Sequence, residues 1–219
     1  MGAQADQVRD DILGRVLSRS LLPDDAIDEA DLRDRLGLSG TPIREALISL
    51  EATGVIRRVP RGGARVMSLS LEQLMKMVEV LAEAEGAAAY RAARRINAAQ
   101  AQRLRAAVQS CLDNAEGRGK AGISYYDVNL QFHTVVLEAT GNEYLQQAVF
   151  GTANRLIGYL STRHDLPGEP LRSARDHAAI AQAILDADGD RARQLMTDHV
   201  TFSDTLALDT FNLLGTRTP

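Results

Sequence analysis

Residues 38–65 read LSGTPIREALISLEATGVIRRVPRGGAR, and this stretch decides the fold of the first third of the chain. Apolar residues recur at spacings of three and four from Ile43 to Leu50, which predicts a short amphipathic helix. Thr41 as N-cap, followed by a proline, predicts where this helix begins, and Gly54 predicts where it ends. Beyond it, VIRRV and ARVM predict two short strands joined by the turn PRGG.

Two further helices are expected before this stretch. The apolar spacing over residues 7–19 predicts the first, and residues 28–36 predict a second that stops at Gly37. The turn GLSG, which leads into the third helix, is as short as a helix-turn-helix requires. Three helices followed by a hairpin predict a winged helix-turn-helix domain over residues 1–69.

From residue 70 onward the sequence predicts only helices. The expected helices span residues 71–95, 98–115, 124–139, 142–162, 170–187 and 190–211, with breaks such as TGN and DADGD between them. Ser70, Asn97 and Ser124 have the spacing of N-caps. The fold class is therefore mainly α, with an antiparallel all-α bundle of six or seven helices over residues 70–219.

Composition and charge limit the classes of function. Apolar residues make up 45% of the 219 residues, there is one cysteine, and no apolar run reaches the length of about 18 residues that spans a bilayer. We therefore expect a cytoplasmic protein with no membrane partner. The net charge of −4 does not favour a polyanion, but residues 57–65 hold four arginines and no acid. A surface for DNA is thus expected to be local.

The third helix and the hairpin carry the candidate DNA contacts. In a helix-turn-helix the N-terminal end of the second helix enters the major groove, where an arginine can bind guanine. Glycines in the hairpin would allow close approach to the duplex. The candidate residues are Ser39, Gly40, Thr41, Arg44, Arg58, Arg61 and Gly62. The alternative is that the arginine-rich hairpin is only a solvated surface.

The stretch LRDRLGLSGTPIREALISLEATGVIRRVPRGGARV resembles the winged helix of the GntR family of bacterial transcription regulators. The family's turn usually reads Ser-Arg-Thr-Pro, so Gly40 stands where an arginine usually touches DNA, and Ala26 replaces another frequent arginine. The resemblance implies a double-stranded DNA operator contacted by Ser39, Thr41 and Arg44, together with Arg61. A homodimer on a palindromic operator is expected, with the Ala-rich helix 71–95 in the dimer seam or, alternatively, in the core.

Three of the four histidines fall on apolar faces of separate expected helices. His133 follows Asn129 by one helical turn, and His177 and His199 lie on the last two helices. A buried imidazole needs a hydrogen-bond partner or a metal, so the residues leave two interpretations open, structural histidines or a metal site. Three nitrogens and one oxygen suit Zn²⁺, with nickel or manganese as alternatives. His164 lies in an expected loop and is not predicted to face inward.

The stretches NLQFHTVVLEATGN and RDHAAIAQAILDADGDRARQLMTDHV are similar to the C-terminal effector-binding (FCD) domain of the FadR-like branch of the GntR family. The resemblance implies a divalent metal held by Asn129, His133, His177 and His199. The first of these positions is often aspartate in the family. A neutral amide leaves the site more positive, so we expect a small carboxylate effector. Arg155 is the candidate to pair with it, or else a surface residue.

These observations predict a DNA-binding transcriptional repressor controlled by a small carboxylate bound near a divalent metal, and not an enzyme. Two alternatives stay open: a DNA-binding dimer whose helical domain is purely structural, and a metal-dependent hydrolase. A hydrolase needs a carboxylate base beside the metal. Asp127 and Asp176 are the nearest in sequence, and both are expected to point elsewhere.

Overall fold

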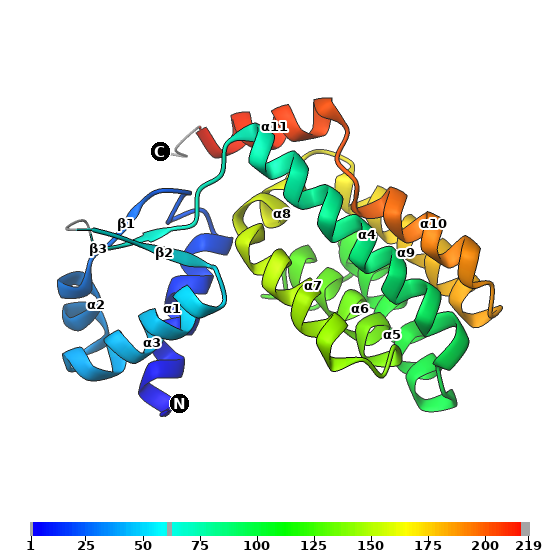
Figure 1. Cartoon of the computed structure of the whole chain (residues 1–219), viewed down its shortest axis with the longest axis horizontal. Helices are drawn as coiled ribbons and strands as arrows, with labels where there is room; N and C mark the ends of the chain where they lie inside the picture. Colours follow the sequence, from blue (N-terminus) through cyan, green and yellow to red (C-terminus); the bar gives the residue numbers. More distant parts are fainter. Residues whose placement is uncertain (1, 61–62, 216–219) are drawn as a thin grey trace.

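The structure is a computed structural model that describes residues 2–60 and 63–215 (Figure 1). The described N-terminal part contains three helices and three short strands. These are α1 (Ala3–Leu17), β1 (Ala26–Ile27), α2 (Glu29–Leu36), α3 (Gly40–Ala52), β2 (Ile56–Val59) and β3 (Gly63–Val66). The predicted winged helix-turn-helix is confirmed, with α2 and α3 as the two helices of the motif.

The three strands form one antiparallel sheet in the order β1-β3-β2. The predicted hairpin pairs Ile56 with Val66 and Val59 with Gly63. The sequence does not predict β1, because two residues are too few to show the alternation of apolar and polar side chains that marks a strand. Apolar side chains from all three helices and from the sheet form the buried core of this domain.

Helix α3 begins two residues before the predicted position. Ser39 is the N-cap, with extended backbone angles of φ −73° and ψ 169°, and Gly40 is the first helical residue. The prediction that Thr41 caps this helix is therefore wrong. Pro42 tolerates the shift, because none of the first four N–H groups of a helix has an intrahelical partner. Ser39 makes no capping hydrogen bond and is exposed.

The chain turns toward the hairpin at Gly54, whose φ of 81° lies in the left-handed region. A Cβ atom at this position would lie 2.6 Å from Cγ of Arg155, a residue of the helical domain. Gly54 therefore serves both the turn and the close approach of the two domains.

The described residues from 71 onward form eight helices. They are α4 (Leu71–Arg95), α5 (Ala98–Ala115), α6 (Tyr125–Ala139), α7 (Glu143–Arg155), α8 (Ile157–Arg163), α9 (Glu169–Leu185), α10 (Gly189–Val200) and α11 (Asp204–Gly215). The mainly α fold class is confirmed. Within the described part of the chain, no helix combines the length and the hydropathy needed to cross a membrane.

Eight helices replace the predicted six or seven because two expected helices are divided. The expected helix 142–162 is interrupted at Leu156, with φ −97° and ψ 0°, between α7 and α8. The expected helix 190–211 is interrupted at Thr201, whose ψ of 136° is extended. Leu156 and Ile157 are buried at the first break, and Val200 and Phe202 are buried on either side of the second. The apolar pattern therefore runs across them, and neither break falls on a proline or a glycine.

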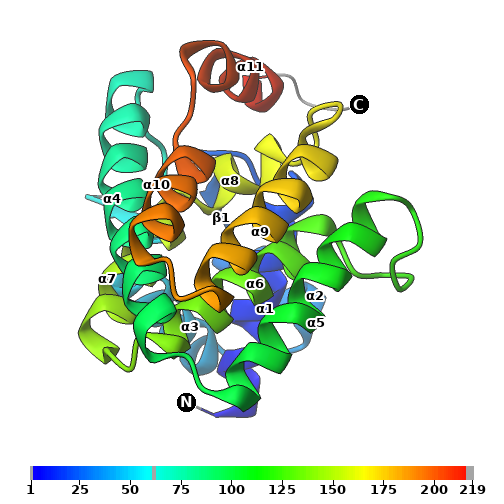
Figure 2. The ribbon, with the colours of Figure 1, turned by 90° about the vertical axis from the view of Figure 1, so that its right-hand side faces the viewer.

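The helices of the second domain begin close to their predicted positions. Ser70, Asn97 and Ser124 cap their helices, and each forms a full capping box with the residue three positions later. Helices α4 and α10 lie side by side (Figure 2). Gly86 permits this packing, because a Cβ atom there would collide with Oγ1 of Thr197.

Helix α8 connects the two domains. At its first turn, Ile157 belongs to the buried apolar cluster of the DNA-binding domain, and Gly158 lies against Val16 of α1. At the linker, the backbone N–H of Leu69 donates to the Tyr159 hydroxyl at 2.9 Å. A second apolar cluster begins at α4. The domain boundary at residue 69 stays a prediction.

Candidate metal centre and nucleic-acid interface

Three histidines from different helices meet inside the helical domain. His133 lies on α6, His177 on α9 and His199 near the end of α10, with exposed fractions of 8%, 0% and 4%. One candidate ligand atom from each ring lies within 4.8 Å of the other two. The structure thus brings together the three histidines that the sequence singles out.

The protonation of these rings follows from their surroundings. Burial lowers the pKa of His177 and of His199 well below 6.5, and the neighbouring histidines lower it further. Both rings are therefore neutral near pH 7, each with one proton and one lone pair. His199 Nδ1 lies 3.2 Å from Oδ2 of Asp176, which favours the proton on Nδ1. The lone pair of His199 Nε2 then faces His177 Nε2 at 3.1 Å.

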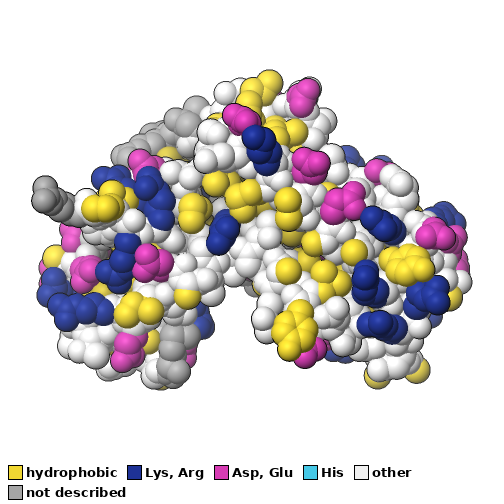
Figure 3. All heavy atoms as spheres, in the orientation of Figure 1, with side chains coloured by type: hydrophobic (Ala, Val, Ile, Leu, Met, Phe, Trp, Pro, Cys, Tyr) yellow, Lys and Arg dark blue, Asp and Glu magenta, His cyan; other side chains and the backbone are white. Residues whose placement is uncertain are grey.

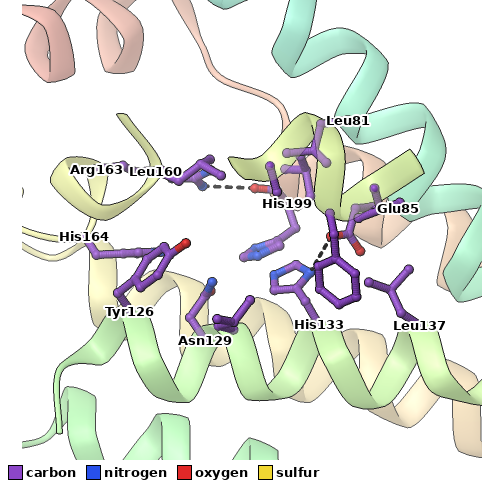
Figure 4. Close-up of a pocket in the computed structure, with 15 residues that line it drawn as sticks. Leu81, Glu85, Tyr126, Asn129, His133, Leu137, Leu160, Arg163, His164 and His199 are labelled. Atoms are coloured by element: carbon purple, nitrogen blue, oxygen red, sulfur yellow. Dashed lines mark hydrogen bonds and ion pairs between the residues drawn. The ribbon is translucent and has the colours of Figure 1, made fainter. Parts of the chain in front are cut away.

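Asn129 lies one turn before His133, and Figure 4 shows both side chains at the same cavity. Its Oδ1 atom is buried and has no hydrogen-bond partner among the described residues. A buried amide oxygen in this state costs free energy unless it meets a donor or a cation. The three histidines could therefore hold a divalent ion, and imidazole nitrogens suit zinc or a similar first-row metal. Asn129 stays a predicted fourth ligand.

Two carboxylates lie against the outer nitrogens of the histidines. Asp176 bonds His199, and Glu85 of α4 places Oε1 at 3.1 Å from His133 Nδ1. The expectation that Asp176 points elsewhere is wrong, because its partner comes from a neighbouring helix that the sequence of α9 cannot place. Asp127 instead closes the capping box of α6. Sequence reasoning missed Glu85, although its position was a signal, because it is the one acid of α4 that falls within the apolar stripe of Leu81 and Ala89.

His133 and His199 open on a cavity of about 60 Å³ (Figure 4). Its wall is largely apolar and includes Leu81, Leu137, Val149, Phe150 and Leu160. A space of this size admits only a small molecule, and the few polar groups on its wall would orient that molecule.

The arginine at this cavity is Arg163, not Arg155. Arg155 is exposed at the end of α7, and its side chain lies against Gly54 of the DNA-binding domain. Arg163 is 3% exposed, and its guanidinium donates to Glu169 at 3.1 Å and to the His199 carbonyl oxygen at 3.0 Å. The sequence could not show which of the two arginines reaches the cavity. The break at residue 156 lies between them, so the periodicity of one helix does not relate the faces on which they lie.

His164 also lines the cavity, although the sequence places it in a loop. It follows the last residue of α8, and its ring lies 5.0 Å from the ring of Tyr125. Its Nδ1 atom is buried and unpartnered among the described residues. Burial, with the nearby Arg163 and His133, lowers the pKa of His164 to about 3, so the ring is neutral near pH 7.

The candidate DNA contacts lie at the start of α3 and on the hairpin. Ser39, Thr41 and Arg44 are exposed, and Gly40 is half-buried. Arg58 is exposed on β2, and its Nε donates to Glu51 Oε2 at 3.0 Å. The remaining two candidates, Arg61 and Gly62, lie outside the described residues.

Tertiary structure brings acids to the arginines of this surface. The hairpin sequence contains none, but Arg57 donates to Asp24 Oδ1 at 2.5 Å and Arg65 donates to the Asp24 carbonyl oxygen at 2.7 Å. Figure 3 shows Lys and Arg side chains next to Asp and Glu side chains over this domain. The basic character of the hairpin is therefore partly neutralised.

Comparison with known proteins identifies the class. The family described as "Bacterial regulatory proteins, gntR family" matches residues 4–66 of this chain. The FCD domain family matches residues 76–202. The chain belongs to the GntR family of bacterial regulatory proteins and carries an FCD domain. It is a transcription regulator and not an enzyme.

Particular relatives agree with this assignment. The chain is 29% identical over 192 residues to the HTH-type transcriptional repressor GlaR of Escherichia coli K12, covering 84% of this chain and 87% of GlaR. It is 26% identical over 194 residues to the repressor RspR of the same organism, covering 85% and 83%. The solved structure of E. coli McbR/YncC shares the fold, with a TM-score of 0.76 at 18% identity over 98% of each chain.

Proposed function

We propose that this protein is a transcriptional repressor whose winged helix binds an operator and whose FCD domain binds a small carboxylate at a divalent metal ion. The observation that carries the proposal is a buried cluster of three histidines, with the unpartnered oxygen of Asn129 beside it, in a chain that also presents Arg44 at the start of α3. The relatives named as repressors support the direction of control.

The operator contacts follow from the exposed start of α3. The first N–H groups of this helix and the hydroxyls of Ser39 and Thr41 suit phosphate oxygens, while Arg44 can bind O6 and N7 of guanine. The test is selection of binding sites from a pool of random duplexes by the full chain, followed by a gel shift. Recovery of a palindrome supports the proposal, and no retention of any duplex at low salt contradicts it.

The metal would be held by Asn129, His133, His177 and His199. When bound, it supplies a positive centre that can accept an oxygen of a carboxylate. Metal content after zinc loading and dialysis tests this site. Wild-type protein that retains no zinc, nickel or manganese would favour the alternative in which the helical domain is purely structural.

A carboxylate effector is favoured by the neutral side chain of Asn129 and by Arg163 at the cavity. The variant Asn129→Asp adds a negative charge, so we expect about tenfold tighter zinc binding and weaker carboxylate binding. Calorimetry of the zinc-loaded protein with a panel of small mono-, di- and tricarboxylates measures the second effect. No change in either affinity contradicts the role of this position.

Control of DNA binding requires that the effector favour one placement of the two domains over another. Helix α8 is suited to this coupling, because Arg163 at its end lines the cavity while Ile157 at its start packs into the DNA-binding domain. A shift of α8 on effector binding would therefore reach α1 directly.

A homodimer is supported by the face that α4 and α7 present. Val80 and Tyr144 are 59% and 75% exposed, and Val149 is the one fully buried residue of α7. Figure 3 shows hydrophobic side chains gathered where these two helices lie in Figure 1. We expect Tyr144→Glu to produce a monomer in analytical ultracentrifugation. Leu208→Glu, at an exposed apolar residue of α11, is the control and should leave the dimer intact.

A further inference from the structure

Glu85 is a buried acid that nothing described so far requires. It lies in the middle of α4 and is 4% exposed. Burying a carboxylate is costly unless it is paired. Among the described residues its one polar partner is His133, whose Nδ1 lies 3.1 Å from Oε1 as an ion-pair contact. His133 Nδ1 and Glu85 Oε2 are both buried, and neither has a hydrogen-bond partner among the described residues.

A carboxylate also lies beside a second histidine of the cluster, and there the contact has hydrogen-bond geometry. Asp176 Oδ2 lies 3.2 Å from Nδ1 of His199. A carboxylate beside Nδ1 holds the ring proton there, fixes the orientation of the ring and leaves the Nε2 lone pair for a metal. His177 has no such partner within the described structure, and its Nδ1 is buried and unpaired.

The two carboxylates differ in their surroundings. The side chain of Asp176 is 33% exposed and shared with Arg172, which donates to it at 3.0 Å. The side chain of Glu85 is 6% exposed and has no arginine beside it among the described residues. The charge of Glu85 therefore acts on His133 with little screening by solvent.

We propose that Glu85 positions His133 as a metal ligand and supplies the negative charge that a carboxylate at position 129 would otherwise give the centre. This inference rests on the proposed metal site. Glu85 acts through the imidazole and not as a ligand itself. The metal centre thus obtains its anionic character from α4 and α9, while Asn129 contributes only a neutral oxygen.

The test compares zinc affinity among matched variants, measured by competition with a chromophoric chelator. Glu85→Gln, which keeps the size of the side chain, should lower the affinity by about 10–100-fold, and Asp176→Asn should lower it less. Glu83→Gln is the control, because Glu83 lies on the same helix with 60% side-chain exposure and pairs with Arg193 at the surface. It should match the wild type.

Two results would overturn the inference. If Glu85→Gln binds zinc as tightly as the control variant does, Glu85 does not position His133 as a ligand. A change in coordination number in the absorption spectrum of the Co²⁺-loaded variant would show that Glu85 is a direct ligand. Failure of the wild type to bind zinc is a different result, because it refutes the metal site itself.

A measurement on the wild type covers the case in which Glu85→Gln does not fold. Long-range ¹H–¹⁵N correlation spectra of the zinc-loaded protein report the proton position on each histidine. We expect the proton of His133 on Nδ1, beside Glu85. A proton on Nε2 of His133 contradicts the inference.

Discussion

The DNA-binding surface and the histidine centre are built in opposite ways. The candidate DNA contacts that the structure describes come from one continuous stretch, Ser39 to Arg58, and most of them are exposed. The histidine centre draws on α4, α6, α9 and α10, and its three histidines are buried. An exposed site can be predicted largely from a local sequence motif. The polar atoms of a buried site also need hydrogen-bond partners, which come from other parts of the chain.

This difference predicts how each site responds to substitution. An exposed charge exchanges a protein contact for water at little cost, so a single change there has a modest effect. A buried ligand has no such substitute. Removal of one histidine should therefore lower the zinc affinity by a larger factor than any single change on the candidate DNA surface lowers the DNA affinity.

The largest effect is expected for His199→Ala. This variant removes one of three imidazole ligands together with the contact to Asp176, and zinc affinity should fall by more than about 100-fold. Metal analysis after dialysis against a zinc buffer measures the loss. Arg44→Ala is the matched control and should keep its zinc, and retention of full affinity by His199→Ala would remove this residue from the metal centre.

Arg44→Ala should have the next largest effect, on DNA instead of metal. Loss of a bidentate contact to guanine costs about 1–3 kcal/mol, which is about 5–150-fold in Kd. Gel shifts on the selected operator and on a variant with that guanine replaced would measure it. Equal weakening on both duplexes would mean that Arg44 contacts phosphate and reads no base.

A smaller gain of affinity is expected for Gly40→Arg. No atom lies within 4 Å of a Cβ built at Gly40, so a long side chain fits at the start of α3. An added phosphate contact of about 1 kcal/mol would tighten operator binding by about fivefold. Gln109→Arg on α5 adds the same charge outside the DNA-binding domain and should have no effect. Unchanged or weaker binding by Gly40→Arg contradicts the placement of this helix.

The smallest effect is expected for Glu51→Gln. This change releases Arg58 from its surface ion pair, whose side chains are 45% and 41% exposed. Exposed pairs contribute about 0–1 kcal/mol, so DNA binding should tighten by about twofold, and the gain should vanish at high salt. Glu72→Gln, which breaks a comparable pair with Lys76 on α4, is the control. A gain in both variants would point to net charge alone.

The sequence predicted the winged helix and most helix starts because these depend on short-range rules. Capping boxes at Ser70, Asn97 and Ser124 are signals of four residues, and the apolar stripe of α3 repeats within one helix. Thr41 as a cap was wrong because two neighbouring polar residues can each cap a helix, and local sequence does not choose between them. The breaks at Leu156 and Thr201 do not fall on a proline or a glycine, so the sequence did not predict them.

By itself, the sequence determined the class of fold and the three histidines that face inward, since helical periodicity alone aligns those faces. Only tertiary structure decided what surrounds them. It placed Glu85 and Asp176 beside imidazoles from other helices, put Arg163 and not Arg155 at the cavity, and brought Asp24 to the arginines of the hairpin. Such contacts join residues far apart in the chain, and their pairing depends on how whole helices pack.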